Sequence, residues 1–362
     1  MDPQTEAAVP AGGPEAFPPA PEGVSAGEHG PWYLAYKRFV RNRVAVAFLG
    51  LFVLIVVFVL AAPLWADHVA HTGPNQTHTL QKLHVGGEVR EVVTPEGKPI
   101  GPQWFEADGK FFLGADSRLG RDEMVRLMYG GRTSLLVGIG SALITTGLAI
   151  LLGLLSGYFR GWVDTVIART LDVLWSLPVF LVGLALGVAL AVGGLKVGPL
   201  EIAGGSLWIP VIVISVFTVP YIARPIRGEV LALSEKEFVE AAVAQGAGPL
   251  RVMFSEILPN LASTIIVFFT LTIANNMLFE AGLSFLGAGV QPPNSSWGTM
   301  ISIGEELLTT QPLLAIIPGT MILLTVLALN IVGDGLRDAL DPRSKIRLEA
   351  HAGMVEPKGS SV

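Results

Sequence analysis

Long apolar segments are the feature that most constrains this chain. Residues 44–65 and 134–158 contain no charged side chain, and each exceeds the roughly 20 residues that a helix needs to cross a bilayer. Four further segments have the same character, although they are shorter or carry proline: residues 173–195, 207–223, 261–279 and 313–332. The sequence therefore predicts an all-α integral membrane protein with about six transmembrane helices.

The composition agrees with a surface that largely faces lipid. Only 15% of the residues are charged, against roughly 25% in a soluble domain. No basic run is interleaved with aromatic residues, so we expect no nucleic-acid partner. Cysteine is absent, which excludes disulfides and thiolate metal sites, and no other metal site is expected.

The cations beside the spans indicate how the chain is oriented. Lys37, Arg38, Arg41 and Arg43 precede the first span, and placing them inside the cell puts 15 of the 24 Lys and Arg residues on that side. Eight of the nine outer cations fall in residues 66–133, and long loops tolerate such charges. Both termini are therefore predicted to be cytoplasmic.

The spans and loops divide the chain into five parts. Residues 1–31 are rich in proline and hold no Lys or Arg, which predicts a disordered tail. The remaining parts are a cytoplasmic flank with the first transmembrane helix (32–65), an extracytoplasmic loop (66–132), a transmembrane core (133–343) with a cytoplasmic loop at 224–260, and a cytoplasmic C-terminal tail (344–362).

The segment 66–113 is too long for a simple connection and is predicted to contain a small extracellular β-hairpin. Turn signals at residues 94–97 and 108–109 interrupt its β-type residues, which are Val89, Glu91, Val93, Phe111 and Leu113. Four of the six histidines also lie here: His68, His71, His78 and His84. Their spacing matches no metal site, so we expect them to be solvated.

The loop at 224–260 carries the strongest local pattern. Ser234 and Glu237 have the spacing of a capping box that would begin a short helix, and Gly246 suits the left-handed residue that ends one. A second segment at 250–258 should end at Pro259 and Asn260. The pattern predicts a helix-turn-helix that either anchors the loop on the membrane or is docked closely by another protein.

Several motifs together resemble one family. Glu240-Ala241-Ala242, Gly246 and Leu258-Pro259 resemble the EAA signature of ABC-importer permeases, with Glu256 in place of its isoleucine. Four further elements resemble the dipeptide and oligopeptide branch of that family: residues 113–122, 157–164, 279–287 with 296–298, and 333–343. The likeness runs from about Trp32 to Arg343, and the long histidine-bearing loop and the N-terminal tail are additions to the family pattern.

The resemblance implies a permease of the type I importer fold in a bacterial plasma membrane. It would form half of a pore for di- or oligopeptides, with nickel or another small solute as the alternative cargo. The implied partners are a homologous second permease, two ABC ATPase subunits and an extracytoplasmic solute-binding protein. Glu240, Ala241, Ala242, Gly246, Leu258 and Pro259 would couple this chain to an ATPase subunit.

No catalytic residue is expected in this chain, which has no phosphate-binding loop of its own. ATP and Mg would bind the partner ATPase subunits, and no cofactor would bind here. A secondary transporter or a channel is the competing interpretation, but we find neither a carboxylate at the centre of a span nor a filter-like motif.

Polar residues in or near the spans are candidates for the transport path. Asn275 and Asn276 in the fifth span would either line that path or form hydrogen bonds between helices. Asp172, Glu280 and Asp334 lie at predicted span ends, where we expect contact with water or headgroups.

Overall fold

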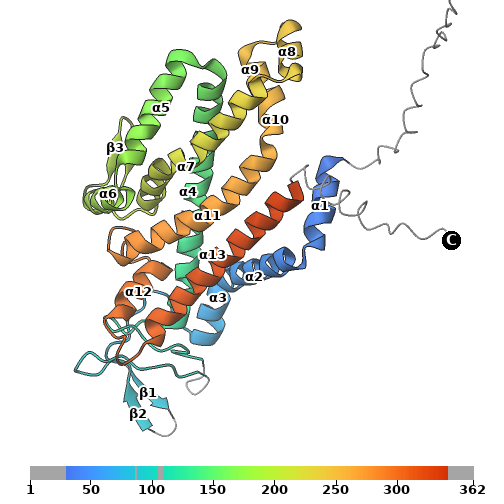
Figure 1. Ribbon diagram of the computed structural model, residues 1–362. Coiled ribbons are helices and arrows are strands. Elements are labelled where there is room, and N and C mark those ends of the chain that lie inside the picture. Colours follow the sequence, from blue (N-terminus) through green and yellow to red (C-terminus); the bar gives the residue numbers. More distant parts are fainter. Residues whose placement is uncertain (1–29, 86–87, 105–108, 341–362) are drawn as a thin grey trace, which may run out of the picture.

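The computed structural model describes residues 30–85, 88–104 and 109–340. The predicted tails at 1–31 and 344–362 fall outside these ranges, apart from the last two residues of the first, and so does the turn residue Asp108. The long helices form an elongated bundle (Figure 1). One end carries the hairpin of β1 (Lys82–Val85) and β2 (Glu88–Glu91), and we call it the hairpin end. The other carries the short helix α8 (Glu237–Ala244), and we call it the α8 end.

Most of the predicted spans are confirmed as long helices. In the described part of the chain, five helices are long and apolar enough to cross a membrane: α2 (Arg43–Leu60), α4 (Glu123–Phe159), α7 (Trp208–Ser234), α11 (Ala262–Phe285) and α13 (Leu313–Leu340). A sixth crossing requires α5 (Gly161–Ser176) and α6 (Val179–Gly193) to act as one span. The all-α membrane architecture predicted from sequence is therefore confirmed.

The third predicted span, residues 173–195, is wrong as a single helix. Helix α5 ends at Ser176, and α6 begins at Val179 at an angle of 85° to it. The cause is Pro178, which lacks a backbone N–H and disfavours helical geometry in the residue before it. Leu177 is accordingly extended, with φ −75° and ψ 139°.

The fourth predicted span, residues 207–223, is too short. Helix α7 continues through Pro220 and Pro225 to Ser234. The first 11 residues assigned to the cytoplasmic loop are therefore part of this helix. Proline is tolerated inside such a helix because neighbouring helices and hydroxyl side chains can satisfy the backbone groups that it frees.

Helices α4 and α7 pack closely because α4 presents glycine to α7. A Cβ atom added at Gly153 would lie 2.6 Å from Ile226 Cγ2, and one added at Gly157 would lie 2.7 Å from Val230 Cβ. On another face of α4, a Cβ at Gly138 would lie 2.3 Å from Met277 of α11. These contacts make α4 the central helix against which the others are held.

The predicted hairpin is confirmed and is smaller than expected, while its extracellular position stays a prediction. Strands β1 and β2 pair in antiparallel register, with Lys82 opposite Glu91, and residues 94–97 form the expected turn. Phe111 and Leu113 are not strand residues but buried turn residues, so their assignment to a strand was wrong. The alternation that suggested a strand reflects their burial in the loop core.

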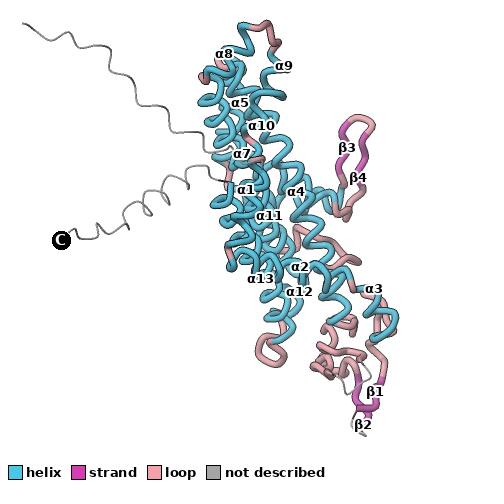
Figure 2. The backbone as a smooth tube through the Cα atoms, turned by 90° about the vertical axis from the view of Figure 1, so that its right-hand side faces the viewer, coloured by secondary structure: helices cyan, strands magenta, loops and turns pink. Residues whose placement is uncertain are grey.

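A second hairpin was not predicted. Strands β3 (Leu195–Val197) and β4 (Leu200–Ile202) pair between α6 and α7, and Figure 2 shows them standing off the side of the bundle. The apolar residues there extend the pattern of the preceding helix, so the sequence did not separate them from it.

The remaining short helices flank the long ones. They are α1 (Pro31–Arg41), α3 (Ala62–Trp65), the π-helical turn η1 (Ala66–Ala70) and α12 (Trp297–Glu305).

Helix α4 begins where the Asp122 side chain accepts hydrogen bonds from the Met124 and Val125 amides, both at 3.0 Å. Asp122 also accepts a hydrogen bond from the Phe111 amide at 2.6 Å. It therefore ties the loop of residues 66–122, which we call the outer loop after its predicted side, to the start of α4. Burial raises the pKa of this carboxyl, and the three backbone donors oppose that rise.

Candidate functional site

Helix α8 begins differently from the prediction. Ser234 is the last residue of α7, and its hydroxyl donates to the Val230 carbonyl at 2.7 Å. Lys236 is the N-cap of α8, and its side chain makes no capping hydrogen bond. The predicted capping box is therefore wrong, because the apolar face of α7 keeps Ser234 helical. Glu235 instead pairs with Arg160, at the end of α4, at 2.9 Å.

The end of α8 is as predicted. Gly246 has φ +87°, in the left-handed region. Its amide donates to the Val243 carbonyl at 2.9 Å, and the Ala247 amide donates to the Ala242 carbonyl at 3.0 Å. This pair of bonds is the Schellman motif, in which a glycine of positive φ ends a helix and reverses the chain.

The return segment does not stop at Pro259. It runs through α9 (Pro249–Arg251), the π-helical turn η2 (Val252–Ile257) and α10 (Leu258–Asn260), and α11 starts at Ala262. Leu258 is half-buried against the core and Pro259 is exposed. We call residues 235–261 the α8–α10 loop. Because α7 precedes this loop and α11 follows it almost without a break, a displacement of α8 would reach both long helices.

The α8–α10 loop exposes the predicted coupling residues. Glu240, Ala241 and Gly246 are exposed and Ala242 is half-buried, while Val239 is buried and holds α8 to the rest of the loop. Large apolar side chains are exposed beside them, namely Phe238, Val243 (52%), Leu250 (68%) and Phe254. Exposed apolar side chains gathered on one short loop are typical of a surface that another protein or the membrane covers.

A groove of about 510 Å³ separates α8 from the ends of α4 and α7. Its lining comes from both sides: Tyr158, Arg160, Ser234, Glu235, Val239, Glu240, Val243 and Ala244. Below it, Arg227 of α7 donates to both oxygens of Asp164 of α5, at 2.5 and 2.6 Å, and Ser156 of α4 donates to the same carboxylate. This network fixes three helices to one another beside a loop that projects from them.

We expect the turn at Gly246 to be sensitive to a single methyl group. Gly246→Ala places a Cβ on a left-handed residue, which costs about 1–2 kcal/mol, although nothing lies within 4 Å of that position. Hydrogen exchange in the peptide covering 237–249 should therefore become roughly 5- to 30-fold faster. Gly248→Ala is the matched control, because Gly248 also has no neighbour within 4 Å but has φ −72°. Equal acceleration in both variants would contradict the role given to Gly246.

Asn275 and Asn276 do not share one surface. Asn276 is fully buried, and its amide donates to Ser141 of α4 at 3.0 Å, whereas Asn275 is exposed. The contact that the structure gives Asn276 is therefore a hydrogen bond between helices. Asn275 stays a predicted path residue.

Glu280 lies elsewhere than predicted. Its side chain is fully buried in α11, not in contact with water or headgroups. It accepts a hydrogen bond from Ser134 of α4 at 3.0 Å and from Ser284 at 2.6 Å. Asp334 is exposed, as predicted, and the half-exposed Asp172 pairs with Arg224 at 2.8 Å. The sequence did contain a signal that could have indicated this burial, because Glu280 lies four residues from a serine near the end of an apolar helix.

A second buried charged group was also missed. Asp116 is fully buried and accepts from Arg121 at 2.5 Å, and the Arg126 guanidinium lies 3.9 Å from the same oxygen. All three belong to the outer loop or to the first turn of α4. The segment 113–122 was recognised as a motif, but which of its charges are buried follows only from the fold.

The four histidines of the outer loop form no metal centre in the described part of the chain, where no group of three or more potential ligands exists. His78 lies 2.7 Å from the Thr72 hydroxyl, and its ring packs against Phe111. It therefore helps to build the loop core, whereas His71 and His84 are exposed.

Two family descriptions match this chain. Residues 149–346 match the binding-protein-dependent transport system inner membrane component, and residues 30–82 match the N-terminal TM domain of oligopeptide transport permease C. The first match contains the whole α8–α10 loop. The second contains α1, α2 and α3.

Similar proteins cover nearly the whole chain. The glutathione transport system permease protein GsiD of Pectobacterium atrosepticum is 37% identical over 87% of this chain and 92% of its own. The dipeptide transport system permease protein DppC of Alkalihalophilus pseudofirmus is 33% identical over 94% and 99%. The di/tripeptide permease DppC of Pseudomonas aeruginosa is 36% identical over 86% and 91%. A chain of the MetNI methionine ABC transporter shares 18% identity with a TM-score of 0.49 over 60% and 97%, which is too distant to support an argument.

Proposed function

Because this chain belongs to the family of binding-protein-dependent transport system inner membrane components, we propose that it forms half of the pore of an ATP-driven importer of di- or oligopeptides. It is a multi-pass membrane permease subunit and not itself an enzyme. The observation that carries the proposal is the exposed α8–α10 loop, which is inserted between two long helices and in which α8 ends in a Schellman turn.

The α8–α10 loop is the proposed docking site of an ABC ATPase subunit. Glu240, Ala241 and Ala242 would face the ATPase, and Gly246 would set the angle at which the chain returns. Movement of the bound ATPase would pull on α7 and on α11, since both helices join this loop directly. ATP and Mg would bind the ATPase subunits, and the complete importer would contain two of these, a second permease and a solute-binding protein.

We place the α8 end in the cytoplasm and the hairpin end outside the cell. Lys37, Arg38, Arg41 and Arg43 support this placement, because they lie in α1 or at the start of α2 and such cations favour the cytoplasmic side. Both termini would then be cytoplasmic, and β1 and β2 would meet the solute-binding protein.

The proposed cargo follows from what the relatives carry. Glutathione, dipeptides and tripeptides, the cargoes in the relatives' names, share a short chain of amide bonds with charged ends. Nickel or another small solute is the alternative cargo, and a direct comparison of the two can decide between them.

The test uses the whole importer in proteoliposomes with its binding protein outside and ATP inside. We expect ATP to drive uptake of labelled dialanine, and neither a non-hydrolysable ATP analogue nor a proton gradient to replace it. Uptake of ⁶³Ni²⁺ instead of dialanine would overturn the peptide assignment. Uptake driven by the proton gradient without ATP would overturn the importer assignment.

A further inference from the structure

Glu280 is the centre of a buried hydrogen-bond hub near the hairpin end of the bundle. Each of its oxygens accepts from a serine hydroxyl, Ser134 on α4 or Ser284 on α11. Each hydroxyl in turn accepts from a backbone amide: Ser134 from Trp297 at 3.2 Å, and Ser284 from Val290 at 2.9 Å. The hub therefore fixes Val290, in the segment 286–296 that connects α11 to α12, and Trp297, the first residue of α12.

Close packing holds the same segment. A Cβ added at Gly289 would lie 2.2 Å from Ser284 Oγ, and one added at Gly298 would lie 2.5 Å from the Ala281 carbonyl oxygen. The Trp297 ring is fully buried and donates to the Leu127 carbonyl of α4 at 2.9 Å. Glu280 makes no salt bridge within the described residues. An unpaired carboxyl in a membrane helix is costly, so its presence points to a positioning role.

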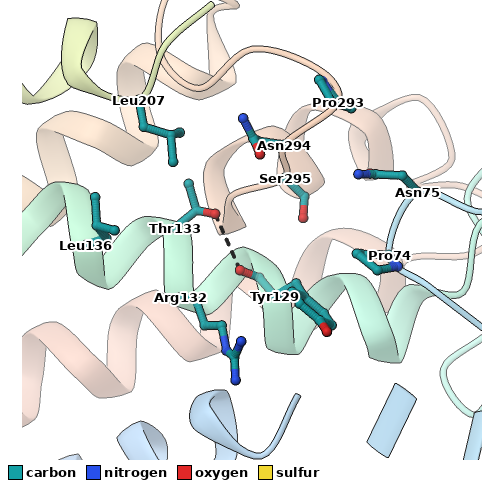
Figure 3. A pocket seen from close by; sticks show the side chains of 10 residues that line it. All are labelled: Pro74, Asn75, Tyr129, Arg132, Thr133, Leu136, Leu207, Pro293, Asn294 and Ser295. Atoms are coloured by element: carbon teal, nitrogen blue, oxygen red, sulfur yellow. Dashed lines mark hydrogen bonds between the residues drawn. The ribbon is translucent and has the colours of Figure 1, made fainter. Parts of the chain in front are cut away.

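The segment held by Glu280 forms one wall of a pocket of about 230 Å³ (Figure 3). Pro293, Asn294 and Ser295 form this wall, and α4 contributes the opposite one through residues 129–136. Asn75 closes an edge: with its amide nitrogen facing the Pro293 carbonyl, it donates at 2.6 Å. The pocket therefore joins the outer loop, the α11–α12 connection and the start of α7 at Leu207.

The pocket is mostly apolar with a few polar groups, and it presents no charge to its interior. None of its lining residues is acidic, and Arg132 is the only cation among them. The Arg132 guanidinium donates to the carbonyls of Val59 and Leu60 at 3.0 and 2.6 Å, and Figure 3 shows it pointing away from the other labelled side chains. What remains is two amides (Asn75 and Asn294), three hydroxyls (Tyr129, Thr133 and Ser295) and four apolar side chains (Pro74, Leu136, Leu207 and Pro293).

We propose that this pocket receives a main-chain amide of the peptide as it leaves the binding protein, and that Glu280 is the positioning residue that shapes it. The Asn294 side chain makes no hydrogen bond to other described residues, so it can donate to a peptide carbonyl and accept from a peptide N–H. A lining without charge can bind the backbone that all peptides share. It does not discriminate between their side chains.

The size of the pocket agrees with partial enclosure. Ligand pockets usually measure about 300–1,000 Å³. A pocket of about 230 Å³ can hold a short stretch of main chain, with the ends of the peptide outside it. The inference rests on the proposed peptide import and on the placement of the hairpin end outside the cell.

Cysteine labelling tests the pocket directly, because this chain has no cysteine of its own. Leu207→Cys, which leaves the Asn294 amide in place, is labelled in the whole importer from outside with a membrane-impermeant maleimide, with the binding protein present and ATP absent. Trialanine should slow labelling at least threefold, whereas the same concentration of free alanine should not. Glu305→Cys at the end of α12 is the control, because this exposed residue does not line the pocket, and its labelling should be unchanged by trialanine. Equal effects of trialanine at both sites would overturn the pocket assignment.

Variants of Glu280 test its positioning role. Glu280→Leu cannot hold either serine and should raise the KM for trialanine uptake at least tenfold. Combined with Leu207→Cys, it should also abolish the protection from labelling. Glu280→Gln has the same shape and should restore most of the affinity.

Ser284→Ala tests the same role with a smaller change. It removes only the Val290 anchor and should raise KM with little change in kcat. An unchanged KM in Ser284→Ala, together with full protection from labelling when it is combined with Leu207→Cys, would overturn the positioning role even if Glu280→Leu fails to assemble.

The outcomes separate this inference from the proposed function. If the unsubstituted importer takes up trialanine and Asn294→Leu does so with the same KM, only the pocket assignment fails. If the unsubstituted importer takes up no peptide, the proposed function fails and this inference fails with it.

Discussion

Reversing the surface of α8 with Glu240→Lys and Val243→Asp should abolish ATP-driven uptake while the chain still reaches the membrane. Both side chains are exposed, so the change should alter the stability of the chain by no more than about 0.5 kcal/mol per site. They line the same groove, and an ATPase subunit seated there would meet a reversed charge and a buried carboxylate at once. Residues at the centre of an interface typically contribute about 2 kcal/mol or more, so we expect at least roughly 30-fold weaker association.

Affinity purification in mild detergent measures this association through the amount of ATPase that accompanies the tagged chain. The matched control is Glu305→Lys with Leu308→Asp. These two residues have the same spacing, are also exposed and lie near the hairpin end. The control should retain the ATPase. Loss of the ATPase in both double variants, or in neither, would show that α8 is not the docking element.

The structural features that were predicted correctly from the sequence are those that depend on residues close together along the chain. Gly246 ends a helix because a left-handed residue there completes two hydrogen bonds within five residues of it, and glycine is the residue that adopts this conformation without cost. The apolar spans were found for the same reason, because about 20 successive residues carry the signal.

Contacts between distant residues explain what was missed. Glu280 looked like a residue at a span end because its partner Ser134 lies 146 positions away. Ser234 looked like an N-cap because the sequence does not reveal that α7 continues to it through two prolines. The bend at Pro178 could have been predicted from proline chemistry alone, but the apolar run on both sides of it indicated one span.

Substitution of a buried charge in the outer loop should also have a large effect, in this case on stability. Neighbouring residues of the motif at 113–122 differ sharply in burial, so the size of the effect should depend on which charge is removed. Asp116 is fully buried, and besides Arg121 it accepts from the Leu119 amide at 2.8 Å. Asp116→Ala would leave the Arg121 guanidinium buried without its partner and would remove one of the two carboxylates near Arg126, the other being Glu123. Breaking a buried pair in this way typically costs about 3–5 kcal/mol.

Arg118 provides the comparison within the same motif. It pairs with Glu306 at 2.7 Å, but both side chains are more than half exposed, so Arg118→Ala should cost at most about 1 kcal/mol. The measurement is the midpoint of thermal unfolding of each purified variant. Asp116→Ala should lower that midpoint several times more than Arg118→Ala does, because water already solvates the Arg118 pair. Equal shifts would mean that the outer loop does not depend on its buried charges, and that the motif at 113–122 serves contact with a partner rather than the fold of the loop.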